Sequence, residues 1–313
     1  MSHVRDLQDV SLPGCALTIG SFDGLHLGHQ ALIRSMVAQA AEDRLPAVVL
    51  TFYPHPSVVL RGRRPAFYIT PPDAKAALLM GMGVDHVITQ TFDEALSKVT
   101  ADAFLDRLIG QLGMRSLWVG EDFALGHERE GNRAFLKRAA GERGFELHVF
   151  PPVLVGGEVV SSTRVREALR AGDVARVAVY LGRPFALTGR VVPGAHRGQQ
   201  LGFPTANLEI PEEQAFPGRG VYACLAAVDH ECLPAVTNVG LRPTFGDSLP
   251  APIVETHLLD VTLDLYDRPL RLEFIERLRE EQRFPDVEAL KAQIRQDVAR
   301  TRQVLATGPE TRP

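Results

Sequence analysis

Two histidines three residues apart, His26 and His29, lie in a glycine-bearing segment at residues 20–29. Imidazole groups placed there could donate hydrogen bonds to phosphate oxygens and stabilise the charge that develops on a leaving pyrophosphate. Glycines let the backbone approach a polyphosphate, and the N-terminus of a following helix favours its charge. The pattern therefore predicts a nucleotidyl-transfer site. Its further candidate nucleotide-binding residues are Gly20, Phe22, Asp23 and Gly28.

Two simpler interpretations of the histidine pair remain open. Histidines at this spacing could form one face of a helix, or they could be two ligands of a metal ion whose third ligand is not evident. The sequence crowds three glycines, an aspartate and both histidines into one turn between a predicted strand and a predicted helix. That crowding favours the nucleotide site.

A second candidate phosphate site lies at residues 161–166, where Ser162, Thr163 and Arg164 precede a helix expected over 165–170. Hydroxyl groups suit a helix N-cap, and an arginine suits a phosphate. The segment follows the last predicted strand of the first half, so we expect a phosphate clamp opposite the histidines. An ordinary capped surface helix is the alternative.

The second half of the chain carries a glycine-rich segment, residues 189–207, that includes Gly194 and Gly202. Its glycines suit a loop that folds over phosphates, and Thr205 and Asn207 alternate, so on a strand both point to one face. Together these two could present oxygens to a magnesium ion that carries ATP phosphates. A glycine-rich hairpin with surface polar residues is the alternative. No G-x-x-x-x-G-K-[ST] motif occurs, so a P-loop fold is not supported.

The hydrophobic pattern predicts the elements that position these residues. Strands are expected at 16–19, 47–52, 84–89, 116–119 and 146–150, and helices from about residue 30, over 101–112 and over 133–143. This alternation predicts an α/β domain with a parallel sheet, in which ligands bind beyond the carboxyl ends of the strands.

The hydrophobic pattern of the sequence changes after Gly182, because no helical pattern separates the apolar runs at 185–192, 221–228 and 253–259. That pattern suggests an antiparallel barrel, and a final helix is expected over 286–305. We therefore predict two domains, 1–182 and 183–313, with the boundary inside 171–183. Residues 307–313 are expected to be frayed.

Composition narrows the class of protein. The chain has 313 residues, 45% hydrophobic and 23% charged, which fits two globular domains. A net charge of -4 argues against a polynucleotide partner and favours small nucleotides. Three cysteines without a C-x-x-C pair argue against a disulfide framework and suggest a reducing cytoplasm. Neither export nor membrane insertion is expected.

The segments 20–29, 54–56, 120–123 and 161–164 together resemble the FMN adenylyltransferase module of bacterial bifunctional riboflavin kinase/FAD synthetases, within the H-x-G-H nucleotidyltransferase superfamily. The likeness covers nearly all of residues 14–180 and implies a Rossmann-like fold. It implies that His26 and His29 bind ATP phosphates, that Ser162, Thr163 and Arg164 hold phosphate, and that His55, Pro56 and Asp122 lie at the flavin site.

The segments 201–207, 220–222, 238–245 and 254–257 resemble the riboflavin kinase module of the same family over residues 183–305. The likeness implies a six-stranded antiparallel barrel, and magnesium with ATP as co-substrate. Thr205 and Asn207 would bind magnesium and nucleotide, and Glu255 would activate the ribityl hydroxyl of riboflavin. The expected activity is phosphorylation of riboflavin to FMN, then adenylylation of FMN to FAD with release of pyrophosphate.

Three residues depart from the family pattern. Ala124 and Leu125 stand where the family often has an arginine and a phenylalanine, and Gln199 stands where an arginine is common. Two other functions fit part of the pattern: a nucleotidyltransferase for a pyridine or pantetheine nucleotide with an accessory barrel, and a regulator that binds flavin or nucleotide without catalysis. The second set of motifs disfavours the first, and the intact histidines, Asn207 and Glu255 disfavour the second. Homo-oligomerisation is left open.

Overall fold

The structure is a computed structural model that describes residues 1–62, 67–194, 198, 201–229, 231–241, 252–261 and 263–306. Two compact units make up the chain, Met1–Ser162 and Thr163–Pro313. The units divide nearer the N-terminus than the expected domain boundary inside 171–183, which stays a prediction. Gln199, residues 242–245 of one motif and the tail 307–313 lie outside the described residues.

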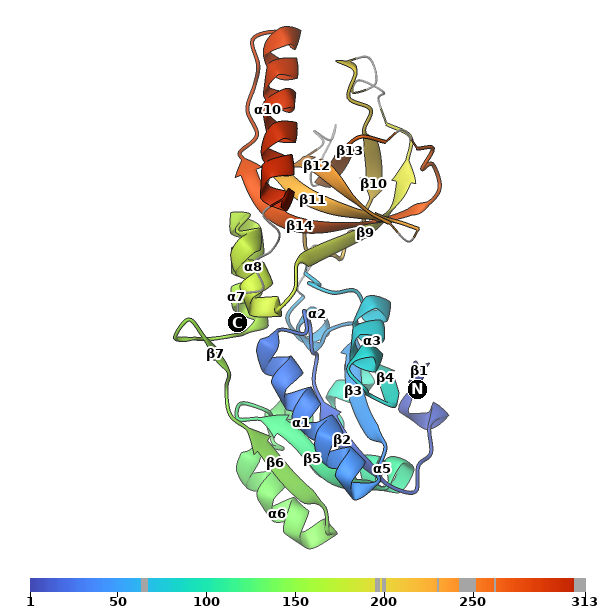
Figure 1. Cartoon of the computed structure of the whole chain (residues 1–313). Coiled ribbons are helices and arrows are strands. Elements are labelled where there is room, and N and C mark those ends of the chain that lie inside the picture. The colour runs from blue at the N-terminus through green and yellow to red at the C-terminus, as the bar shows by residue number, and fades with distance from the viewer. Residues whose placement is uncertain are drawn as a thin grey trace. The chain divides into compact units, whose positions relative to one another are not determined.

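The first unit is built on a six-stranded sheet in the order β1-β4-β3-β2-β5-β6, shown in blue to green in Figure 1. Every neighbouring pair is parallel. The strands are β1 (Ser2–Val4), β2 (Cys15–Ile19), β3 (Ala47–Tyr53), β4 (His86–Thr91), β5 (Met114–Gly120) and β6 (Glu146–Phe150). A short hairpin follows, β7 (Leu154–Val155) with β8 (Glu158–Val159).

Helices cover both faces of this sheet. They are α1 (Leu27–Asp43), α2 (Pro56–Arg61), α3 (Pro72–Gly81), α4 (Glu94–Ser97), α5 (Ala101–Leu112) and α6 (Arg133–Arg143), with short 3₁₀ turns η1 (Leu7–Asp9) and η2 (His127–Arg129). On one face Leu17 and Leu50 pack with residues of α5 and α6, and on the other face Ala16 and Val49 pack with residues of α1 and α3. The central strands are consequently buried on both sides, as their continuous apolar runs predict.

Several expected elements match the structure. The strand at 146–150 and the helices at 101–112 and 133–143 coincide with β6, α5 and α6. The first helix begins at Leu27 rather than near residue 30, and β4 begins at His86 rather than at residue 84. The edge strand β1 and the helix α3 were not expected.

The second unit contains a closed six-stranded barrel in the order β10-β13-β12-β11-β14-β9, with every described pair antiparallel. The strands are β9 (Phe185–Val192), β10 (Ala206–Glu209), β11 (Gly220–Val228), β12 (Glu231–Leu241), β13 (Pro252–Leu258) and β14 (Pro269–Arg279). The helices are α7 (Ser162–Ala171), whose first residue belongs to the first unit, α8 (Val174–Leu181) and α10 (Val287–Ala306). The predicted α/β domain and six-stranded barrel are therefore confirmed.

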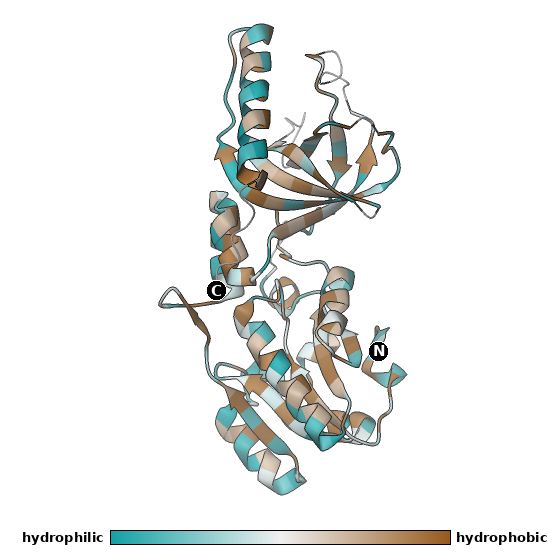
Figure 2. Cartoon of the chain, viewed as in Figure 1, coloured by the Kyte–Doolittle hydropathy of each residue, from teal (hydrophilic) through white to brown (hydrophobic). Residues whose placement is uncertain are grey.

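Hydropathy follows this architecture. In Figure 2 the strands of the sheet and of the barrel are largely brown, whereas α6 and α10 carry long teal stretches. Alternate residues of β9 are buried, as expected for a strand with one face toward a barrel core. No helix in the described part of the chain is long and apolar enough to cross a membrane.

Candidate active sites

The first candidate site lies at the carboxyl edge of the parallel sheet. The chain leaves β2 toward β3 on one side, and β5 pairs with β2 on the other side. The loops that follow β2 and β5 therefore meet where the direction of strand order reverses, which is the usual ligand site of an open α/β sheet. The loop after β2 contains both histidines of the predicted nucleotidyl-transfer site.

Asp23 organises the loop after β2. Its buried carboxylate accepts hydrogen bonds from the backbone N–H groups of Ile69 (3.2 Å) and Thr70 (3.1 Å). Its own carbonyl accepts a hydrogen bond from the Ser162 hydroxyl at 2.8 Å. Ser162, the first residue of α7, is thus bonded to the histidine loop, and α7 begins there rather than at residue 165. The phosphate clamp stays a prediction. Asp23 has a structural role here, and its nucleotide contact stays a prediction.

His26 and His29 lie against each other at the start of α1. His26 is the N-cap residue, and its Nδ1 accepts a hydrogen bond from the backbone N–H of His29 at 3.4 Å. The two rings are stacked with centroids 3.6 Å apart, and Phe22 meets the His29 ring edge-on at 5.2 Å. The Nδ1 atom of His29 is buried without a hydrogen-bond partner in the described structure. The helix-face alternative therefore does not describe His26, which precedes the helix.

Burial keeps both histidines neutral. It lowers the pKa of His26 from 6.5 to about 4. It also lowers the pKa of His29 well below its usual value, and positive charge on a protonated His26 or on Lys75 would oppose protonation of this ring further. Because a neutral imidazole still has one N–H group, each ring can donate one hydrogen bond to a phosphate oxygen.

Acid should therefore destabilise the first unit. Since the pKa of His26 is lower in the folded state than in the unfolded state, the unfolded chain binds its proton more tightly as the pH falls from 6.5 to 4. The free energy of unfolding should drop by roughly 3 kcal/mol for this residue alone. His26→Asn keeps an N-cap acceptor without titrating, so it should remove much of that loss. Denaturant unfolding at a series of pH values, followed by the signal of Trp118, measures this loss in the parent and in the variant, because Trp118 is the single tryptophan and lies in this unit. An equal loss of stability in His26→Asn would contradict the role given to His26.

Lys75 is a site residue that the sequence reasoning missed. It lies on α3 with 4% of its surface exposed. Its Nζ donates to the carbonyl of Ser21 and to Oγ1 of Thr51, both at 2.8 Å. A signal was present, because the helical spacing of Lys75 with Ala76 and Leu79 puts the lysine on the apolar face of its helix.

The other predicted residues of the first half occupy separate places. His55 caps α2 by accepting a hydrogen bond from the Ser57 N–H at 3.0 Å, and Pro56 is the first residue of that helix. Asp122 is exposed in the loop after β5. Thr163 and Arg164 lie in the first turn of α7, within the second compact unit.

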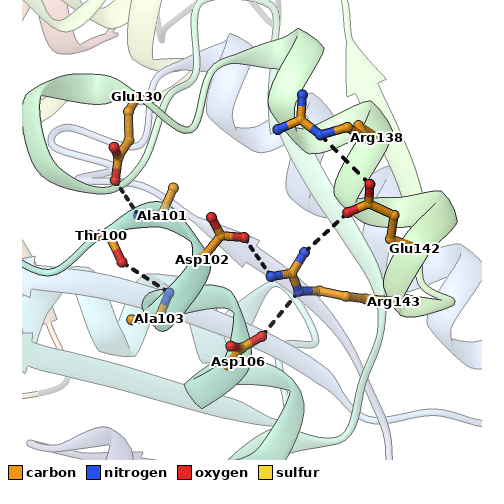
Figure 3. Close-up of polar contacts among 9 residues, drawn as sticks. All are labelled: Thr100, Ala101, Asp102, Ala103, Asp106, Glu130, Arg138, Glu142 and Arg143. Carbon is orange, nitrogen blue, oxygen red and sulfur yellow. Dashed lines mark hydrogen bonds and ion pairs between the residues drawn. The ribbon is translucent and has the colours of Figure 1, made fainter.

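The loop after β5 is fastened to the start of α5 (Figure 3). The Glu130 carboxylate accepts a hydrogen bond from the Ala101 N–H at 2.7 Å. The neighbouring α6 is linked to α5 by Arg143, whose guanidinium contacts Asp102 at 2.5 Å and Asp106 at 3.1 Å. Exposed ion pairs of this kind contribute about 0–1 kcal/mol each. The loop that carries Asp122 therefore follows directly from β5 at one end and is bonded to the start of α5 at the other.

Leu125 shows what one departure from the family pattern means physically. Its side chain is 7% exposed and belongs to the hydrophobic core that includes Phe104 and Ala101. Its backbone pairs with Gly131 in both directions, at 3.2 Å and 2.9 Å. An apolar side chain at this position anchors the loop, and leucine meets that requirement. Ala124 is half-buried, and no contact of its methyl group explains the departure there.

The second candidate site consists of two cavities of about 340 Å³ each in the barrel unit. Gly194, Pro204 and Asn207 line the first cavity, together with the apolar residues Leu263 and Tyr266. The second cavity lies between the barrel and α10; its lining includes Phe203, Asn238, Glu255, His257, Phe284 and Ile294. Thr205 lines both, so the two cavities are neighbours.

Strand register brings Asn207 and Glu255 side by side. Asn207 of β10 is the cross-strand partner of Glu255 of β13, which in turn is the partner of Asn238 of β12. Cross-strand partners point to the same face of a sheet. The neighbouring residues Val254 and Thr256 are buried, so this polar row lies on the outer face of the barrel wall.

The loop before β10 is held close to this row. Nδ1 of His257 lies 2.7 Å from the carbonyl oxygen of Pro204, which fixes the residue before Thr205. Gly194 faces the Asn207 amide so closely that a Cβ atom at Gly194 would overlap it. Gly202, in contrast, has open space around it, and its glycine serves a left-handed backbone with φ of 86°.

An ion pair that the sequence did not reveal lines the second cavity. Nη2 of Arg279 on β14 contacts Oδ2 of Asp297 on α10 at 2.8 Å, and Asp297 is 5% exposed. Gln293 donates a further hydrogen bond to Asp297 at 3.0 Å. The pair links α10 to the barrel beside the cavity that Glu255 lines. Breaking it would be costly, because removing one partner leaves an uncompensated buried charge.

The residues present fit a magnesium ion that arrives with a nucleotide. Among the described residues, no group of three or more histidine, cysteine, aspartate or glutamate side chains could hold a metal ion by itself. Thr205 and Asn207 offer a hydroxyl and an amide oxygen to one cavity. Magnesium prefers oxygen ligands and is commonly bound by few protein groups plus substrate phosphates.

Comparison with known families divides the chain as its architecture does. The family model described as FAD synthetase matches residues 8–164. The model described as riboflavin kinase matches residues 181–305. Each candidate site therefore lies mostly within one matched segment.

Curated relatives cover nearly the whole chain. A bifunctional riboflavin kinase/FMN adenylyltransferase from Pseudomonas fluorescens is 40% identical over 302 residues, with 94% of each chain covered. Enzymes of the same description are 37% identical in Escherichia coli strain K12, with 96% of each chain covered, and 33% identical in Bacillus subtilis, with 95% of this chain and 94% of the relative covered. A crystal structure described as a macrolide-efflux protein from Streptococcus pneumoniae has a TM-score of 0.88 at 29% identity, covering 96% of this chain and 98% of its own. The last likeness concerns the fold.

Proposed function

The chain belongs to the family of bifunctional riboflavin kinase/FMN adenylyltransferases, and from that premise we propose which residues perform each of its two reactions. The enzyme makes flavin cofactors: it is a riboflavin kinase and an FMN adenylyltransferase. We assign adenylyl transfer to the histidine loop after β2, and phosphoryl transfer to the pair of barrel cavities. The substrates of these sites are riboflavin, FMN and ATP.

For adenylyl transfer, the FMN phosphate attacks the α-phosphorus of ATP and pyrophosphate leaves. His26 and His29 donate their N–H groups to phosphate oxygens and stabilise the charge that develops on the pyrophosphate. The start of α1 adds the positive end of a helix dipole. Ser162, Thr163 and Arg164 hold phosphate at the start of α7, and Asp122, His55 and Pro56 lie at the flavin. The stacked, neutral pair at the carboxyl edge of the sheet supports this assignment.

For phosphoryl transfer, ATP occupies the cavity lined by Asn207, and riboflavin occupies the cavity lined by Glu255. The Glu255 carboxylate accepts the proton of the ribityl hydroxyl as that oxygen attacks the γ-phosphorus, and ADP leaves. Magnesium bound by Thr205 and Asn207 would neutralise phosphate charge. The single observation that carries this assignment is that Thr205 lines both cavities, with Asn207 of the first cavity and Glu255 of the second paired across two strands.

The proposed magnesium ligands predict how the metal requirement changes. Asn207→Leu removes the amide oxygen, so the magnesium concentration that half-saturates FMN formation should rise by about tenfold or more. The magnesium dependence of FAD formation from supplied FMN should stay the same. Purified enzyme is given riboflavin or FMN with ATP at a series of magnesium concentrations, and the flavins are separated chromatographically.

Asn238→Leu is the matched control for this experiment. Asn238 lies in the same polar row but lines the cavity assigned to riboflavin. Its substitution should change the riboflavin concentration needed for half-maximal rate, without the magnesium shift. An unchanged magnesium dependence in Asn207→Leu would remove this residue from the metal site.

The cellular location proposed for this enzyme is the cytoplasm. Cys15 and Cys224 are buried and free, and Cys232 is exposed and free, as suits a reducing compartment.

A further inference from the structure

Lys75 is placed where a buried charge is costly. A lysine is almost never fully buried without partners, and this one is 4% exposed. Its ammonium has three N–H groups, and the described residues supply two acceptors, the Ser21 carbonyl and the Thr51 hydroxyl. One N–H group is left without a protein acceptor in the described part of the chain. Such an arrangement suits an ammonium group whose positive charge also acts on a nearby anionic ligand.

One acceptor lies just after β2 and the other lies in β3, the parallel strand beside it. Ser21 is in the loop that leads from β2 to the histidines, and Thr51 lies near the carboxyl end of β3. Thr51 also donates to the Ser21 carbonyl at 3.1 Å. Lys75 therefore links the histidine loop to the neighbouring strand, and α3 is the element that carries it.

The charge of Lys75 acts on one of the two site histidines, His29. Burial is the main cause of the lowered pKa of His29, and the positive charge of Lys75 disfavours protonation of that ring further. Three titratable groups on the elements around Lys75 are coupled to its charge: Asp23 of the loop after β2 raises the pKa of Lys75, and Lys75 lowers the pKa of His29 on α1 and of His3 on β1. Both site histidines are neutral, so they bring dipoles but no net charge to a tetra-anionic nucleotide.

We propose that Lys75 is a positioning residue for adenylyl transfer: its ammonium fixes the histidine loop between β2 and β3 and supplies positive charge behind the polyphosphate. This inference rests on the proposed location of the adenylyl-transfer site. Lys75 acts through Ser21 and through its field at His29. It exchanges no proton with substrate.

The charge should also produce a pH signature. Burial lowers the pKa of Lys75 to about 8, and Asp23 partly opposes that shift. Above this pH the free enzyme loses the ammonium, so kcat/KM for adenylylation should decline on the alkaline side. Bound polyphosphate favours the charged form, so kcat should decline at a higher pH than kcat/KM.

The test compares Lys75→Met and Lys75→Gln in the full chain. Methionine removes charge and hydrogen bonds, whereas glutamine keeps one amide donor for Ser21 without charge. Both variants should lower kcat/KM for adenylylation by about 10–100-fold, mainly through a higher KM for ATP, and both should lose the alkaline decline near pH 8. Lys98→Met is the matched control, because Lys98 is an exposed lysine of the same unit that pairs with Glu94.

Three readouts separate the outcomes. If Lys75→Gln restores the parent rate and pH profile, the lysine is a structural tether, and the proposed electrostatic role is wrong. If both variants fail to fold, as judged by thermal unfolding, the parent enzyme decides, since a kcat/KM profile that stays flat through pH 8 overturns the proposal. His29→Ala is measured alongside: full activity there refutes the site, whereas loss there with unchanged Lys75 variants refutes the role of Lys75 alone.

Discussion

Glu255→Gln should lower the rate of riboflavin phosphorylation by about 10²–10⁴-fold. We expect the smaller figure, because the attacking hydroxyl loses its proton late in a loose phosphoryl-transfer reaction, so the base contributes less to the rate. Glutamine keeps the size of the side chain and its place beside Asn207 and Asn238, but it cannot accept the hydroxyl proton. Adenylylation of supplied FMN should be nearly unchanged. Turnover at saturating riboflavin is the measurement, because it isolates the chemical step from binding.

Glu209→Gln is the matched control for Glu255. It makes the same substitution at an exposed glutamate of β10, the strand that carries Asn207. Turnover in this control should equal that of the parent. A folded Glu255→Gln variant within a few-fold of the parent would leave Thr205, Asn207 and magnesium as the main source of catalysis.

His29→Ala should lower FAD formation from FMN by about 10²–10³-fold, the cost of losing a preorganised donor to transition-state charge. The substitution also removes the ring that stacks on His26, so part of the loss will come from disorder of that neighbour. FMN formation should continue at the parent rate. FMN should therefore accumulate when riboflavin is the substrate.

A histidine at the other edge of the sheet provides the control. His86 begins β4, at the amino edge of its strand, and its Nδ1 lies 2.8 Å from the Ser2 hydroxyl. His86→Ala should leave both activities close to those of the parent. If His29→Ala reduces both activities equally while remaining folded, the two reactions do not have separate sites.

Parts of the fold could be predicted because local signals agreed with the tertiary structure. The helix α5 begins after Thr100, whose side chain accepts a hydrogen bond from Ala103, and it ends at Gly113 in the left-handed region. The helix α6 has the same arrangement, with Asn132 at its start and Gly144 at its end. These caps fix both ends from the sequence.

Other features depend on contacts that no local pattern encodes. The strand β1 has three residues and forms only by pairing with β4, far away in sequence. The start of α7 at Ser162 is linked to the bond between its hydroxyl and Asp23, 139 residues earlier. The buried Arg279–Asp297 pair likewise joins a strand to a helix that only the fold brings together.

The candidate sites divide in the same way. His26 and His29 were identifiable because their chemistry is concentrated in one loop, whereas Lys75 enters that site from a helix that the sequence reasoning did not single out. Asn207 and Glu255 were named from separate motifs, and their pairing is a matter of strand register. Sequence thus indicates chemical groups more readily than it indicates their neighbours.

The shared wall at Thr205 has a stereochemical consequence for the proposed kinase reaction. Because Thr205 lines both the cavity proposed for ATP and the cavity proposed for riboflavin, the phosphoryl group can pass directly between the two ligands, with the attacking oxygen and the departing ADP oxygen roughly in line at the γ-phosphorus. Each transfer of the phosphoryl group then inverts the configuration at its phosphorus atom. A γ-phosphate made chiral with oxygen isotopes would emerge on FMN with inverted handedness.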